Sequence, residues 1–335
     1  MKRRMVQCGK NGDMMRRSRA GKRTGNMTGT KTGKRTGGAA RAVWAFCAAL
    51  SLTACAGGNP AAGQGGQDIS AGQGVSSGQD ADWLAERTKR DRRTTQDQIT
   101  EPQDEDKVTR ISLDDLDGRI ILAEGGDIWL SGRLDGQVVI EAEEDELVHL
   151  YLAGVEITSL NGPAIQIREA AKTIVTLVSD TENVLADSPD YTDCEDTPAC
   201  LYSACDLTVN GDGALRVSGY HEDGVRSKDR IKILGGTVAV QAKGDGIRGN
   251  DGIYIQNASV VVESEKNGLR TVNQGADDRG VIEIDGGAVS VVAGKSGICA
   301  AADLYLYHGT CSVNAVEENV RTEGCAYIAE GCMED

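Results

Sequence analysis

Aromatic residues are scarce in this chain: they make up 4% of its 335 residues, and only one of them is Phe. This scarcity excludes a large core filled by aromatic side chains. Proline is also rare, with 5 residues, whereas glycine contributes 43. The last two-thirds of the chain are dominated by Gly, Val, Ile, Asp and Asn, and this composition favours many short strands joined by tight turns.

Histidine occurs only three times, at His149, His221 and His308, and these positions share no register in the repeat described below. They therefore form no obvious metal or nucleophile set. No Gly-rich phosphate loop precedes a helical pattern. Nothing in the sequence singles out a catalytic base, so we name no catalytic residue.

Charge is divided unevenly along the chain. Residues 1–54 carry 13 of the 36 basic residues and one acid, Asp13, so 23 basic and 50 acidic residues follow, a net charge of −27. A mature protein this acidic repels nucleic acid. It suits divalent cations, or a partner reached through cations, with simple solubility as the alternative reading.

The apolar run 42–52 is too short to span a bilayer, which takes about 20 apolar residues. It follows a basic segment and ends in Leu52-Thr53-Ala54-Cys55, which resembles the lipobox of bacterial lipoproteins. The resemblance implies a lipoprotein signal peptide over 1–54 and acylation of Cys55, so that a lipid alone anchors an extracellular protein to the bacterial cell membrane. The alternative is an ordinary signal peptide with a chance cysteine. Residues 55–107 are first Gly-, Gln-, Ala- and Ser-rich and then charged, which predicts a flexible tether.

A short motif recurs through the rest of the chain. The tetrapeptide 223–226 (DGVR) returns in related form at 245–248, 267–270, 296–299 and 318–321, in steps of 22, 22, 29 and 22 residues. A second half of each repeat alternates apolar and polar residues, which is the period of a strand with one buried face. A unit this short buries its apolar face only by stacking on its neighbours.

The repeat predicts an all-β fold over 108–335: a right-handed parallel β-helix, a solenoid with about 22 residues per coil. Stacked coils bring equivalent residues together, so one inward column is expected to contain Val225, Ile247 and Leu269. Cys311 falls in another inward column and is expected to be a small core residue. The pairing of the cysteines cannot be deduced from their spacing.

The same stacking predicts columns of like charge about 4.8 Å apart. Their carboxylates repel unless a cation intervenes, and calcium accepts irregular sets of oxygen ligands. Two alternatives are that the acids are turn residues and that neighbouring arginines neutralise them. The candidate calcium ligands are Asp223, Asp229, Asp245, Asn250, Asp251 and Asn267.

A column of arginines alternates with the inward column and should face outward. Guanidinium groups hold carboxylates in pairs of hydrogen bonds, so this column suits a uronic-acid polymer, with salt bridges to the acidic column as the alternative. Two tyrosines share a second outward column and offer rings for stacking on sugars, although ordinary sheet-surface tyrosine is the commoner case. The candidate ligand-binding residues are Arg226, Arg248, Arg270, Tyr254 and Tyr305.

Several segments, 152–161 (LAGVEITSLN), 173–187 (TIVTLVSDTENVLAD), 207–217 (LTVNGDGALRV) and the repeated tetrapeptide, resemble clostridial-type carbohydrate-binding domain-containing surface proteins, many of them lipoproteins. The resemblance covers roughly 110–335. It implies a right-handed parallel β-helix related to pectate lyases, calcium sites, and binding of cellulose-like and pectin-like polysaccharides without established catalysis. This chain departs from the pattern in its segment of cysteines 194, 200 and 205, and where Asn267 and Ser296 replace aspartate.

The sequence thus predicts a calcium-assisted, cell-surface protein that binds polysaccharide and is not catalytic. One alternative is a calcium-dependent polysaccharide lyase, and another is a surface adhesin or scaffold.

Overall fold

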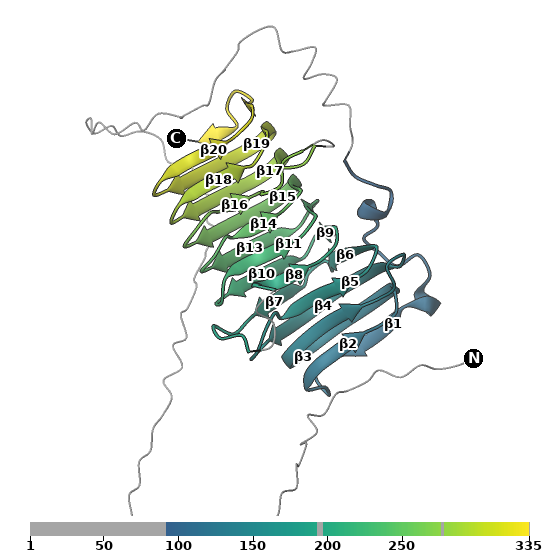
Figure 1. Ribbon diagram of the computed structural model, residues 1–335. Helices are drawn as coiled ribbons and strands as arrows, with labels where there is room; N and C mark the ends of the chain where they lie inside the picture. Colours follow the sequence, from purple (N-terminus) through teal and green to yellow (C-terminus); the bar gives the residue numbers. More distant parts are fainter. Residues whose placement is uncertain (1–91, 193–196, 276–277, 335) are drawn as a thin grey trace, which may run out of the picture. The chain divides into compact units, whose positions relative to one another are not determined.

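The computed structural model of the chain describes residues 92–192, 197–275 and 278–334, and these form two short 3-10 helices and 22 strands (Figure 1). The predicted signal peptide and Cys55 lie outside the described residues. No helix within the described ranges is long and apolar enough to cross a membrane.

The elements follow one another in chain order. The first half contains η1 (Gln96–Gln98), η2 (Glu105–Lys107), β1 (Thr109–Ser112), β2 (Gly118–Leu122), β3 (Gly126–Glu141), β4 (Leu147–Thr158), β5 (Ile165–Glu169), β6 (Lys172–Leu177), β7 (Glu182–Ala186), β8 (Ala199–Ser203), β9 (Leu207–Gly211) and β10 (Ala214–Gly219). The second half contains β11 (Asp223–Ser227), β12 (Arg230–Ile233), β13 (Thr237–Ala242), β14 (Ile247–Gly249), β15 (Gly252–Ser264), β16 (Leu269–Arg270), β17 (Val281–Ala293), β18 (Ser296–Ala300), β19 (Leu304–Ala315), β20 (Glu318–Thr322), β21 (Ala326–Ile328) and β22 (Met333–Glu334).

Equivalent residues of successive repeats are neighbours across parallel strands, as predicted. Val225 in β11 pairs with Ile247 in β14, which pairs with Leu269 in β16. The same line continues through Ile298 and Val320. All five residues belong to or pack against one hydrophobic core, so the repeated motif does supply one inward column.

The predicted fold class, a right-handed parallel β-helix (a solenoid with about 22 residues per coil), is wrong, and the arrangement of the strands corrects it. The described strands join into one continuous sheet of 22 strands. Long strands such as β3 run unbroken from one side of the core to the other, pairing with β4 over one part and with β2 and β5 over the next. The sheet is a closed, all-parallel β cylinder with additional strands around one core.

The expected offset of 22 residues occurs in both halves of the domain, as between Gly126 and Val148, but the first half also contains other offsets. Gly118 pairs with Gly136, an offset of 18 residues, whereas Ile165 pairs with Leu201, an offset of 36. The extra residues of the longer offset include the cysteine-bearing segment before β8. Loops of different length between strands therefore interrupt a regular pairing without displacing the core columns.

Close packing requires the glycine that the first four of the five tetrapeptides carry, whereas the fifth has Asn319 at this position. At Gly246 an added Cβ would lie 2.1 Å from Cγ1 of Val262 and 2.8 Å from the carbonyl oxygen of Gly268. The equivalent Gly224 faces Val240 in the same way. The motif therefore carries Gly because a neighbouring valine occupies the place of its side chain.

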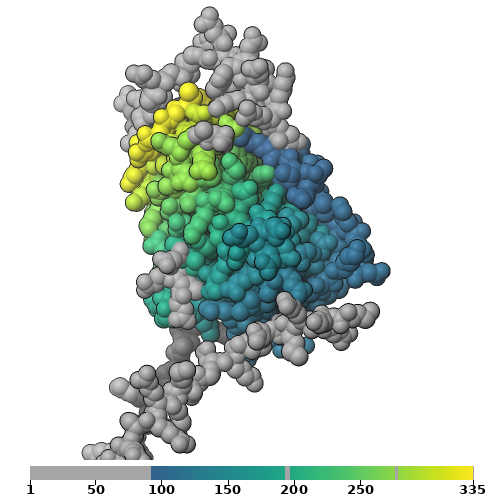
Figure 2. All heavy atoms as spheres, turned by 45° about the vertical axis from the view of Figure 1, so that its right-hand side comes forward, coloured from purple at the N-terminus to yellow at the C-terminus, as the bar shows by residue number. Residues whose placement is uncertain are grey.

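Residues 92–107 were predicted as part of a flexible tether, but the structure places them against the domain. The Asp97 side chain is fully buried and forms ion pairs with Lys172 and Lys232. A pattern of apolar periodicity could not reveal this contact because it is made by charged groups. In Figure 2 the blue atoms, which belong to this segment and to the first strands, lie along one side of the domain.

We predict that Gly246→Ala lowers the free energy of unfolding by about 1–3 kcal/mol, because overpacking a closely fitted site displaces Val262 or the backbone. Urea unfolding followed by circular dichroism measures the change. Val261→Ala, on the exposed face of the same wall, is the control and should change stability by less than about 0.5 kcal/mol. Equal stability of Gly246→Ala and wild type would contradict the packing described.

Candidate functional site

The first acidic column consists of Asp223, Asp245 and Asn267, which are buried and accept hydrogen bonds from the backbone of the next strand. Oδ1 of Asp223 accepts the amide of Asp245 at 2.8 Å, and Oδ1 of Asp245 accepts both the amide and the side-chain nitrogen of Asn267 at 3.2 and 2.7 Å. Oδ1 of Asn267 in turn accepts the amide of Ser296 at 3.4 Å. Each side chain therefore binds its own equivalent one strand along.

Close stacking has an electrostatic consequence. Burial raises the pKa of Asp223 to about 6, and the neighbouring Asp245 carboxylate adds to the rise. Oδ2 of Asp223 is buried without a hydrogen-bond partner, although the guanidinium of Arg226 lies 3.6 Å away. Asp223 is thus the acid of this column that has the weakest compensation.

The predicted arginine row exists, since Arg226 pairs with Arg248 and Arg248 with Arg270 across adjacent strands. Its charges are directed at the acidic column. Arg248 and Arg270 lie 3.8 and 3.1 Å from Oδ2 of Asp245. Burial and the neighbouring Arg226 lower the pKa of Arg248. The salt-bridge alternative therefore describes this row, while Arg321 turns to Glu323 instead.

The second acidic column consists of Asp229 and Asp251, and polar donors also contact the carboxylate of Asp251. Oδ1 of Asp251 accepts the side-chain amide of Asn273 at 2.5 Å, and its Oδ2 lies 3.5 Å from Nε of Arg279. Burial raises the pKa of Asp229, with a contribution from the nearby Asp206. Asn250 lies beside this column, where its Oδ1 accepts from Arg248 at 3.3 Å.

These contacts do not fit the predicted calcium ligands. Calcium needs six to eight oxygens directed at one point. The oxygens of Asp245, Asn267 and Asp251 instead accept from amide and guanidinium groups, and no group of three or more His, Cys, Asp or Glu suited to a metal occurs among the described residues. In this structure arginine guanidinium groups lie 3.1–3.8 Å from Asp223, Asp245 and Asp251, and backbone amides donate to Asp223 and Asp245.

The two predicted sugar-stacking tyrosines do not face solvent. Tyr254 is 5% exposed and Tyr305 is fully buried. The guanidinium of Arg92 lies over the Tyr254 ring, 4.7 Å from its centre, and the hydroxyl of Tyr305 donates to Asp303. Alternation correctly placed both rings on the outer face of the wall, but it could not show that other groups cover that face.

The six described cysteines are free thiols, and they include Cys200 and Cys205 of the departing segment. Cys311 is buried in the core as predicted. Burial raises its pKa to about 12, with a contribution from the nearby Cys332. Cys311 therefore acts as a small apolar residue.

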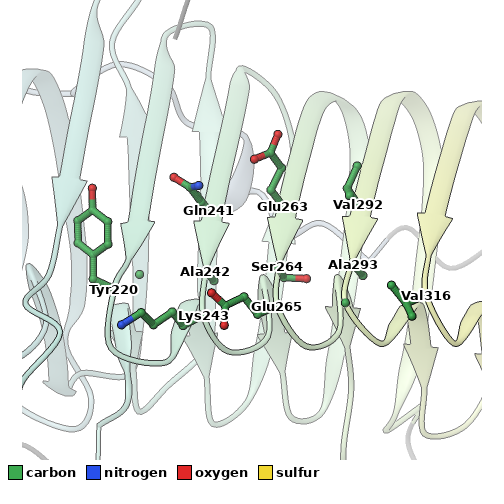
Figure 3. A pocket seen from close by; sticks show the side chains of 12 residues that line it. Tyr220, Gln241, Ala242, Lys243, Glu263, Ser264, Glu265, Val292, Ala293 and Val316 are labelled. Carbon is green, nitrogen blue, oxygen red and sulfur yellow. The ribbon is translucent and has the colours of Figure 1, made fainter. Parts of the chain in front are cut away.

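A groove that sequence reasoning missed crosses the ends of β10, β13, β15, β17 and β19 (Figure 3). It has a volume of about 420 Å³. Its floor consists of small residues in register, namely Gly219, Ala242, Ser264 and Ala293. The small floor residues leave a trough because the residues on both sides carry longer side chains.

Along both edges of the groove the polar side chains are grouped on β13 and β15, and Val292 and Val316 lie toward one end (Figure 3). One edge carries Gln241, Glu263 and Val292, which pair across neighbouring strands. The other edge carries residues of the turns that follow the strands. This second edge consists of Tyr220, Lys243, Glu265, Gly294 and Val316.

Three features make this groove a candidate binding surface. The ring of Tyr220 is 47% exposed at one end, and Val292 and Val316 are exposed toward the other. The buried hydroxyl of Ser264 on the floor has no hydrogen-bond partner. From Tyr220 to Val316 the groove spans four strand spacings, which is about 19 Å.

A signal for the groove was present in the sequence. Small residues recur at the ends of the strands in one register, and exposed aliphatics flank them. Period-two alternation identifies strands by their large inward residues. Gly, Ala and Ser at the strand ends are also common in turns, so their sequence alone does not indicate a groove. Only the pairing of five strands shows that these small residues lie side by side.

Comparison with known proteins places the chain in a family. A family model described as "Carbohydrate-binding domain-containing protein" matches residues 116–331. A relative of the same description from Acetivibrio thermocellus is 36% identical over 238 residues, which cover 69% of this chain and 83% of the relative. The chain therefore belongs to the family of carbohydrate-binding domain-containing proteins.

A solved structure supports the relationship. It is the polysaccharide lyase-like protein from C. thermocellum, recorded as a gadolinium derivative, with a TM-score of 0.65 and 25% identity. The match covers 68% of this chain and 98% of that one. The fold of this chain is thus similar to that of a polysaccharide lyase-like protein.

We predict that Asp223 makes the stability of the domain depend on pH. Its folded-state pKa of about 6 lies above the unfolded value, so the folded state binds the proton more tightly, and stability falls as pH rises between about 4 and 6. Asp223→Asn removes this loss. Its stability relative to wild type should improve by about 2–3 kcal/mol from pH 4 to pH 7.

Urea unfolding at both pH values measures this difference. Asp117→Asn, at an exposed position, is the matched control and should show no comparable improvement. A stability gap between Asp223→Asn and wild type that does not change with pH would contradict the assignment.

Proposed function

We propose that this protein is a non-catalytic polysaccharide-binding protein of the bacterial cell surface, and that a neutral, cellulose-like chain binds in the groove of Figure 3. Membership of the carbohydrate-binding family supports the class of ligand. The observation that carries the choice of site is a groove that crosses five consecutive strand ends and has an exposed tyrosine at one end.

The lining suits the two kinds of surface that a sugar presents. The face of a sugar ring with its C–H groups packs on an aromatic ring, which Tyr220 supplies, while its hydroxyls need donors and acceptors. Gln241, Lys243, Glu263 and Glu265 supply both.

Charge favours a neutral ligand here over a uronate. Glu263 and Glu265 face the groove, and Lys243 is the one basic residue among the groove-lining residues described. A carboxylate on each sugar would meet two like charges along this trough. The arginine row is less suited to uronate than the sequence indicated because its guanidinium groups already pair with Asp223 and Asp245.

The surface location is part of the proposal. The segment ending in Cys55 supports export and a lipid anchor, which would hold the domain outside the cell membrane. The acidic charge of the mature chain agrees with a partner that is not nucleic acid. A polysaccharide lyase remains the alternative function, motivated by the polysaccharide lyase-like structural neighbour.

We predict that Tyr220→Ala weakens retention on insoluble cellulose about tenfold, since a stacking contact contributes on the order of 1 kcal/mol beyond the area it buries. Val261→Ala, exposed on the same wall but outside the groove lining, is the matched control and should bind like wild type. A depletion isotherm with the full chain measures both. Equal retention of Tyr220→Ala and wild type would exclude this groove, and no retention of wild type would exclude the proposed ligand.

Calcium assistance stays a prediction, and the same assay tests it. If calcium takes part, adding a chelator should release wild-type protein from the polysaccharide, and added calcium should restore binding. Unchanged retention in chelator would show that the arginine-neutralised columns need no metal. A rise in ultraviolet absorbance from unsaturated ends during incubation with uronate polymers would instead support the lyase alternative.

A further inference from the structure

One carboxylate attaches the N-terminal segment to the domain. Among residues 92–112 Asp97 is the one buried residue, and the others are half-buried or exposed. A docked segment normally buries apolar side chains, because their burial supplies most of the stabilisation. This segment instead buries an acid, which is stable only where donors surround it.

The donors come from three neighbouring strands. Lys172 at the start of β6 and Lys232 in β12 form ion pairs with the Asp97 carboxylate, the second at 2.9 Å. The hydroxyl of Thr208 in β9 donates to its Oδ1 at 2.6 Å. Burial alone raises the pKa of Asp97, but hydrogen bonds from Lys172, Thr208 and Lys232 outweigh it and hold that pKa well below its usual value.

The remaining contacts of the segment are also polar. The side-chain amide of Asn210 donates to the carbonyl oxygens of Asp97 and Ile99 at 2.9 and 2.8 Å. Nζ of Lys232 also donates to the carbonyl oxygen of Arg92 at 2.5 Å. Arg92 itself donates to Glu283 and to the hydroxyl of Tyr254. A ligand that offers the same polar groups can therefore replace the hydrogen bonds and ion pairs that hold the segment.

We propose that Lys172, Thr208 and Lys232 form a binding site for the carboxylate of a uronic-acid residue in a polysaccharide, and that Asp97 occupies this site in the free protein. The proposal rests on the proposed carbohydrate-binding function for its class of ligand. It assigns acidic sugars to a different face from the groove, which binds the neutral chain.

The surroundings of this site suit a sugar polymer. Thr208, Lys232 and Tyr254 are consecutive partners across parallel strands, so the tyrosine ring lies one strand spacing, about 4.8 Å, beyond the second lysine. Displacement of Arg92 uncovers that ring for a neighbouring sugar. The predicted role of Tyr254 in sugar stacking would then apply once the segment has moved.

Occupation by Asp97 lowers the apparent affinity for uronate, because only molecules with the segment displaced can bind. Asp97→Ala in the full chain removes the competitor and leaves a vacant carboxylate site. This variant should have a lower Tm than wild type. Its affinity for a galacturonate trimer should exceed that of wild type at least tenfold, and the trimer should raise its Tm in a concentration-dependent way.

Calorimetric titration and thermal unfolding with the galacturonate trimer and with cellotriose of equal length give the two readouts. The gain should be absent with cellotriose, absent with a glutamate tripeptide, and lost in Asp97→Ala combined with Lys232→Gln. Arg92→Ala is a second variant that loosens the segment and leaves the three donors intact, and it should also gain uronate affinity. Circular dichroism should first show that both variants are folded. If either folded variant binds the galacturonate trimer no better than wild type, the proposal is overturned.

Equal binding of the glutamate tripeptide would also overturn the proposal, because the site would then recognise carboxylates without regard to sugar. These outcomes are independent of the groove. If wild type is not retained on cellulose while Asp97→Ala gains uronate affinity, the proposal of a neutral ligand for the groove is wrong and the carboxylate site stands. If retention depends on Tyr220 and uronate affinity does not change, the carboxylate site alone is wrong.

Discussion

Parallel strands in register place every residue about 4.8 Å from its own equivalent, and this constraint governs the whole molecule. It benefits apolar residues, since Val225, Ile247 and Leu269 pack in one line within a single core. It penalises acids, because a repeated aspartate faces another aspartate. Two contacts offset this repulsion in the structure. Each carboxylate accepts a hydrogen bond from a backbone amide of the next strand, and an arginine three residues further along the chain lies beside it.

The sequence predicted the elements that depend on periodicity. It correctly identified the all-β character, the pairing of residues 22 apart, the inward columns and the arginine row, since each follows from alternation and repeat spacing. It did not predict the closure of the sheet or the 36-residue offset before Leu201. Those features depend on long strands and loops that have no internal repeat.

In the candidate sites, too, the sequence predicted what depends on alternation and missed what depends on contacts between distant segments. Outward orientation of Tyr254 was predictable, but its cover by Arg92 arises from a segment 162 residues away in the chain. The groove follows from small residues at the ends of separate strands, which only the pairing brings together. Calcium ligation was inferred from the stacked acids alone and stays a prediction, whereas the contacts between Asp245 and its arginine neighbours could be seen only in the structure.

The groove has a length that the architecture can change only in whole steps. Each of the three central strands, with the turn residue that follows it, contributes one floor residue and one residue to each edge, as Gln241, Ala242 and Lys243 do for β13. Gain or loss of one repeat by duplication or deletion would therefore lengthen or shorten the trough by a single strand spacing and leave its cross-section unchanged. A change in the number of repeats can therefore adapt such a domain to polymers of different length, while the residues that contact each sugar stay the same.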